Sequence, residues 1–91
     1  MNEEQREKVK MICRLWEDHE DCCGTISSLK VINSRVGSIV ISQPFHNMTT
    51  ANIDFDTKRA LLTGAINELN HLKETIEVKL SNELGELCKQ Q

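Results

Sequence analysis

An apolar stripe in the last third of the chain constrains the fold more than any other feature. Aliphatic residues recur there every three or four positions: Leu62, Ile66, Leu69, Leu72, Ile76, Leu80, Leu84 and Leu87. This spacing is one face of an amphipathic helix. The preceding Phe55-Asp56 is typical of an apolar residue followed by a helix cap. We therefore predict a long helix over residues 57–88, whose apolar face must be buried.

The length of this helix predicts association. A helix over residues 57–88 spans on the order of 48 Å, whereas a compact chain of 91 residues is only about 30 Å across. We therefore expect its C-terminal half to overhang, and an overhanging apolar row needs a partner, most commonly a second copy. The predicted interface of this homo-oligomer is Leu69, Leu72, Ile76, Leu80, Leu84 and Leu87. A break near Ser81-Asn82, which would give a folded-back helix pair, is the alternative.

A second helix is predicted over residues 3–23. Asn2 can cap it, and Gln5 completes the spacing of a capping box. Gly24 stands where a terminating glycine is common. The residues expected on its apolar face are Val9, Ile12, Trp16, His19 and Cys23, with Met11, Leu15 and Cys22 widening the stripe.

Residues 25–55 are expected to hold strands and loops. Residues 38–42 are β-branched and stop before Pro44, which predicts a strand. Residues 29–32 are its expected hairpin partner, although the spacing of Ile26, Leu29, Ile32 and Val36 also fits a helix stopped by Gly37. Residues 50–55 supply a further strand, after a turn around Asn47. The expected fold is α+β in a single domain over residues 1–91, and an all-α helical bundle is the alternative.

Composition and charge exclude several classes of partner. The net charge of −3 disfavours duplex nucleic acid as a partner, and three aromatic residues are too few for a single-strand stacking platform. The polar, acidic first residues do not resemble a signal peptide, and no apolar run reaches the roughly 20 residues of a membrane span. We therefore expect a cytoplasmic protein, no membrane contact and four reduced cysteines.

The most unusual stretch is acidic. Glu17, Asp18, Glu20 and Asp21 fall in the expected last turns of the first helix, where the helix dipole prefers cations. A basic partner protein would compensate these charges. His19 with Cys22 or Cys23 also has zinc-type spacing, but a structural zinc site needs four ligands, and the other histidines and cysteines lack pair spacing. No metal and no cofactor is assigned.

A second group of residues suits an anionic ligand. These residues are Arg59, Thr63, Asn67 and His71, spaced by four, with Asn70 beside them, and Lys30 and Arg35 near Gly37. Arginine can pair with phosphate, so an anionic metabolite or signalling nucleotide between subunits would fit. An ordinary solvated helix face and ordinary turn chemistry are the alternatives. No nucleophile, phosphate-loop or other catalytic motif is present, so we expect no enzyme.

Three functional hypotheses follow. The leading one is a non-enzymatic, homo-oligomeric binding or inhibitor protein that blocks a basic host partner through its acidic surface. The second is a sequestering protein for a small anion, and the third is a structural or assembly subunit. In size, charge and lack of enzyme motifs, the chain resembles the small accessory proteins of bacteriophages and mobile elements.

Overall fold

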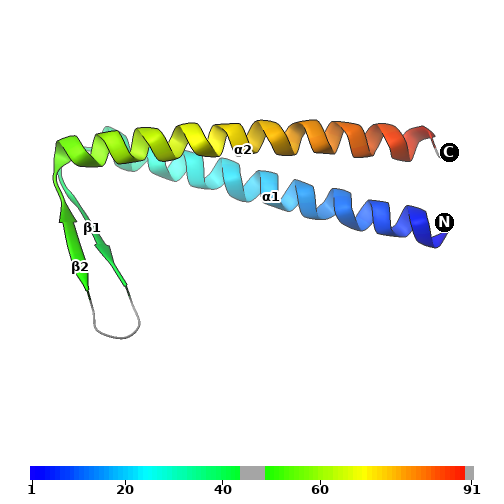
Figure 1. Ribbon diagram of the computed structural model, residues 1–91, viewed down its shortest axis with the longest axis horizontal. Coiled ribbons are helices and arrows are strands. Elements are labelled where there is room, and N and C mark those ends of the chain that lie inside the picture. Colours follow the sequence, from blue (N-terminus) through cyan, green and yellow to red (C-terminus); the bar gives the residue numbers. More distant parts are fainter. Residues whose placement is uncertain (44–48, 90–91) are drawn as a thin grey trace.

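Two long antiparallel helices, joined by a β-hairpin, make up the computed structural model, which describes residues 1–43 and 49–89. The order is α1 (Glu3–Ser34), β1 (Ile39–Ser42), β2 (Thr50–Ile53) and α2 (Phe55–Lys89). The helices lie side by side, with the start of α1 and the end of α2 together, and the hairpin projects sideways from the opposite end (Figure 1). The α+β fold is confirmed, and the all-α alternative is wrong because β1 and β2 pair.

Helix α1 begins as predicted but ends later. The Asn2 side chain accepts a hydrogen bond from the Gln5 backbone N–H at 2.8 Å, and the Gln5 side chain accepts one from the Asn2 N–H at 3.1 Å. The helix then passes through Gly24 and ends at Ser34, so the predicted end at residue 23 and the predicted strand over residues 29–32 are wrong. Buried Ile26 and half-buried Leu29 extend the row that packs on α2, and this burial outweighs the poor helix propensity of one glycine.

The β-hairpin confirms two predicted strands with a different pairing. Strand β1 pairs antiparallel with β2, in the register Ile39↔Ile53, Val40↔Asn52, Ile41↔Ala51 and Ser42↔Thr50. The partner of β1 is therefore the segment after it. Gly37 makes the bend between α1 and β1 with a φ of 132°, a conformation that favours glycine. The turn predicted around Asn47 lies outside the described residues.

Helix α2 confirms the long C-terminal helix but has a different cap. It begins at Phe55, and the capping side chain is Asp54 rather than Asp56. The Asp54 carboxylate accepts a hydrogen bond from the Thr57 backbone N–H at 2.8 Å. This bond to the backbone N–H, with a further one to the Thr57 side chain, lowers the pKa of Asp54 below its ordinary value of 3.8.

The core is a single seam between the two helices. Its buried apolar side chains are Cys22, Ile26, Leu62, Ile66, Ile76 and Leu80. The expected overhang of α2 is wrong: Leu80 is only 7% exposed within one chain. An overhang would arise in a compact chain about 30 Å across, whereas this chain measures 55 × 30 × 14 Å and α1 runs alongside α2.

Polar contacts close the seam at both ends. Near the termini, the Lys8 ammonium forms ion pairs with Glu83, at 3.1 Å, and with Glu86. The hydrogen bond to Glu86 is the main cause that raises the pKa of Lys8, and the same bond lowers the pKa of Glu86. At the hairpin end, the Lys58 side chain, 2% exposed, donates a hydrogen bond to the Arg35 carbonyl.

A glycine substitution tests the continuous α1. A Cβ built on Gly24 meets nothing within 4 Å, so we expect Gly24→Ala to raise the free energy of unfolding by about 0.5–1 kcal/mol. Gly37→Ala is the matched control and should destabilise, because Gly37 has a positive φ. Thermal unfolding followed by circular dichroism measures both. A loss of stability in Gly24→Ala would mean that α1 ends at this glycine after all.

Acid should weaken the fold through Asp54 and Glu86. Both carboxyl groups have a lower pKa in the folded chain than their ordinary values of 3.8 and 4.5. The unfolded chain therefore binds protons more readily than the folded one. The two carboxylates stabilise the fold above these ordinary pKa values, and this stabilisation is lost as the pH falls through the lowered pKa.

We therefore expect Tm to fall less between about pH 6 and about pH 2 in Asp54→Asn/Glu86→Gln than in the unsubstituted protein. Lys8 has a raised pKa, so its protonated side chain stabilises the fold at pH values below the ordinary value of 10.5. Deprotonation of Lys8 removes this stabilisation only at higher pH, outside the range of the acid test. Glu68→Gln/Glu74→Gln is the control for removing two carboxylates. An equal fall in Tm for all three proteins would contradict the assigned hydrogen bonds.

Candidate functional site

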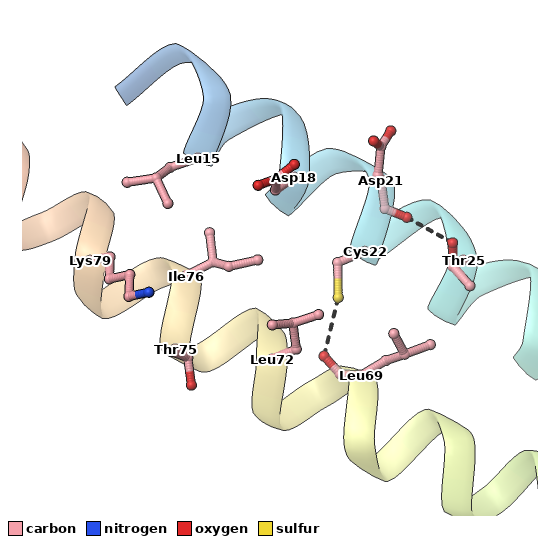
Figure 2. Close-up of a pocket in the computed structure, with 10 residues that line it drawn as sticks. All are labelled: Leu15, Asp18, Asp21, Cys22, Thr25, Leu69, Leu72, Thr75, Ile76 and Lys79. Carbon is pink, nitrogen blue, oxygen red and sulfur yellow. Dashed lines mark hydrogen bonds between the residues drawn. The ribbon is translucent and has the colours of Figure 1, made fainter. Parts of the chain in front are cut away.

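A groove runs between α1 and α2 on one broad face of the helix pair. It has a volume of about 400 Å³ and is lined by Leu15, Asp18, Asp21, Cys22 and Thr25 of α1 and by Leu69, Leu72, Thr75, Ile76 and Lys79 of α2. Figure 2 shows these side chains, with Asp18 and Lys79 carried on opposite helices. The groove therefore has an apolar floor and charges of opposite sign on its two borders.

The polar side chains on the floor of the groove donate hydrogen bonds to backbone carbonyls of the protein itself. Cys22 is 5% exposed, and its thiol donates a hydrogen bond to the Leu69 carbonyl at 3.1 Å, which joins the two helices (Figure 2). The hydroxyls of Thr25 and Thr75 donate to carbonyls of their own helices, at 2.9 and 3.0 Å. The floor consequently offers few free donors to a polar ligand and mainly presents carbon.

The four acidic residues lie in the middle of α1 and not at its end. The helix dipole therefore does not favour a cation beside them, because it acts only within the last turn of α1. Asp18 and Asp21 border the groove, whereas Glu17 and Glu20 do not line it. Within residues 1–43 and 49–89, none of the four forms an ion pair. Their charges are left to solvent or to a partner.

Trp16 sits beside Glu20 and is 55% exposed, although its spacing placed it on the apolar face. Its indole N–H donates to the Glu20 carboxylate at 3.1 Å, and its ring stacks on His19 at 6.0 Å between centroids. The row that meets α2 steps by three and four through Ile12, Leu15, His19, Cys22, Ile26 and Leu29. Trp16 falls outside this strict seven-residue pattern. Because the prediction accepted any spacing of three or four residues, it placed Trp16 on the apolar face.

The zinc-type residues are divided between two environments. His19 Nδ1 lies 3.9 Å from the Cys23 thiol, and His19 Nε2 lies 3.0 Å from Glu77. Cys22 instead bonds to Leu69. In the described part of the chain, no three histidine, cysteine or acidic side chains are grouped so that they could hold a metal ion. His46 lies outside that part.

The residues expected to hold an anion do not line the groove. Arg59 lies over the Phe55 ring, 5.7 Å from its centroid, and the Thr63 hydroxyl accepts a hydrogen bond from Asn33 at 3.4 Å. Among the others, Asn70 is half-buried, and Lys30, Arg35, Asn67 and His71 are exposed. Buried Lys58 was not anticipated, although it lies one turn before Leu62 in the apolar row.

The predicted interface residues divide by exposure. Ile76 and Leu80 are buried against α1, Leu69 and Leu87 are half-buried, and Leu72 and Leu84 are 50% and 46% exposed. Of these six residues, only Leu72 and Leu84 thus leave about half of a side chain for a partner, and Leu72 lies on the groove.

Comparison with protein-family models, curated proteins and solved structures finds no match to this chain. Neither α1 nor α2, over the described residues, has a stretch apolar enough to cross a membrane. The site must therefore be interpreted from its own chemistry.

Thiol reactivity tests the packing of the groove. Cys13 and Cys88 are exposed, whereas Cys22 is buried. We expect iodoacetamide to modify Cys13 and Cys88 first and Cys22 only when the protein unfolds, because the thiolate must be accessible to react. Mass spectrometry of peptides after timed labelling measures the order. Modification of Cys22 as rapidly as Cys13 would contradict the contact with Leu69.

Proposed function

We propose that this protein is a non-enzymatic binding protein that blocks a partner protein by docking the acidic side of α1 on a basic surface. The observation that carries this proposal is the placement of Glu17 and Glu20, with Asp18 and Asp21 beside them, next to a tryptophan that is 55% exposed. No ion pair within the described residues compensates these carboxylates.

The charges supply a physical reason for a basic partner. Glu17 lies three and four residues from Glu20 and Asp21, the spacing at which like charges on a helix repel each other. Cationic side chains of a partner would relieve this repulsion and would steer the encounter. The acidic side would thus favour association with a basic protein and disfavour an acidic one.

Trp16 supplies the apolar anchor of this surface. Tryptophan is enriched among the few residues that dominate binding energy in protein interfaces. The hydrogen bond to Glu20 and the stacking on His19 hold the indole in one orientation before binding. Less conformational entropy is then lost when a partner covers the ring.

The other two hypotheses have less support. Sequestration of a small anion needs cationic side chains around one cavity, and Lys30, Arg35 and Arg59 line no part of the groove. A purely structural subunit would leave the exposed indole and the acidic side of α1 without a role.

A matched pair of variants tests the proposal. Proteins from the source cells are captured on the immobilised protein, the captured partner is purified, and its Kd is measured at rising salt concentration. We expect Glu17→Gln/Glu20→Gln to weaken binding by about tenfold and Trp16→Ala by about thirtyfold. Salt should weaken binding of the unsubstituted protein, because it screens exposed charges.

Glu68→Gln/Glu74→Gln is the control, since it removes the same charge from exposed positions on α2. An equal loss of affinity in the control would show that binding depends on the net charge of the protein and not on the acidic side of α1. Unchanged affinity in Glu17→Gln/Glu20→Gln would refute the acidic docking surface.

A further inference from the structure

The helix pair is a single layer with two solvent-facing sides. The shortest dimension of the whole chain is 14 Å, little more than the roughly 10–12 Å thickness of one helix with its side chains. Within the described residues, only six apolar side chains are buried. Several large ones are about half exposed, among them Met11 at 45%, Ile32 at 40%, Leu61 at 50% and Leu72 at 50%.

These four side chains belong to the groove face. Eleven residues make just over three turns of a helix, so residues eleven apart lie on one side. Met11 is eleven residues before the groove residue Cys22, and Ile32 is eleven after the groove residue Asp21. Leu61 is eleven before Leu72 on α2. The apolar face therefore extends along both helices beyond the groove itself.

We infer that a second copy of this chain seats on the groove face, with α1 of each copy packed antiparallel on α2 of the other. The two-fold axis runs parallel to the helices and the product is a four-helix bundle. This inference does not rest on the proposed function, because Glu17, Glu20 and Trp16 lie outside the groove lining.

Charge selects this arrangement over the other two-fold stacking of the same faces. Asp18 and Asp21 lie near the middle of α1, which spans residues 3–34. Stacking α1 antiparallel on its own copy would therefore bring the aspartates of both chains together, and like charges that face each other in an interface weaken association.

The proposed arrangement instead joins opposite charges. An axis parallel to the helices keeps each residue at the same height along the bundle. Lys79 borders the groove from the other helix, at the end where Leu15 lies, and Asp18 is nearer to that end than Asp21 (Figure 2). In the dimer, Asp18 of one copy consequently lies near Lys79 of its partner, and the contact occurs twice by symmetry.

The size of the face is sufficient for a stable dimer. Helices of 32 and 35 residues give a face roughly 50 Å long and roughly 20 Å wide, on the order of 1,000 Å². A standard stable interface buries about 800 Å² per partner. The apolar floor of Leu15, Leu69 and Leu72 would form its centre and the charged residues its rim.

A charge swap tests the inference. Asp18→Lys alone and Lys79→Asp alone should each weaken the homodimer about tenfold or more, because each places like charges opposite each other twice. An equimolar mixture of the two variants should form a heterodimer about as stable as the unsubstituted homodimer. In the mixture, each introduced charge faces an opposite charge. Native mass spectrometry and sedimentation velocity at micromolar concentration measure these species.

Leu72→Glu provides a second test. Leu72 is half exposed in one chain, so the substitution should leave the helices folded, as measured by circular dichroism. It should nevertheless abolish the dimer. The inference is overturned if the unsubstituted protein is a monomer, if the mixture forms no heterodimer, or if Leu72→Glu still dimerises. A tighter homodimer for Asp18→Lys would instead assign the α1-on-α1 stacking and overturn it as well.

Discussion

The packing of α1 along α2 is the contact on which the rest of the structure depends. A helix isolated in water is only marginally stable, so each helix needs the apolar row of the other. Ile26, Ile66 and Cys22 form the centre of that seam. Polar partners at its two ends, Lys8 with Glu83 and Lys58 with the Arg35 carbonyl, disfavour a shift of one helix along the other. The β-hairpin can project from the helices because the seam does not need it.

The same packing gives α1 two functional sides. A two-helix layer leaves both broad faces in solvent, and acidic residues in one stretch of α1 are divided between them. Asp18 and Asp21 border the groove, where a second copy would seat. Glu17 and Glu20 stay with Trp16, where a basic partner would dock. Assembly and partner binding would then use neighbouring surfaces and would be separable by substitution.

The sequence predicted both long helices, but it misplaced helix boundaries that were assigned from one residue. The apolar period of α2 and the capping box of α1 are both present in the structure. Gly24 was interpreted as a terminator, but burial of Ile26 and Leu29 against α2 carries the helix past it. Asp56 was interpreted as the cap, yet Asp54 makes the bond, because boundaries depend on local geometry that spacing does not resolve.

The sequence by itself determined the two amphipathic helices, the short strands between them and the acidic stretch, because these follow from local spacing and residue type. Only the tertiary structure decided that α1 covers the C-terminal half of α2, and so buries Leu80. It also decided that Asp18 and Lys79 border one groove from opposite helices while Trp16 remains exposed. The physical reason is that the alignment of two helices is set by contacts between residues distant in the chain, such as Cys22 and Leu69, which no local pattern encodes.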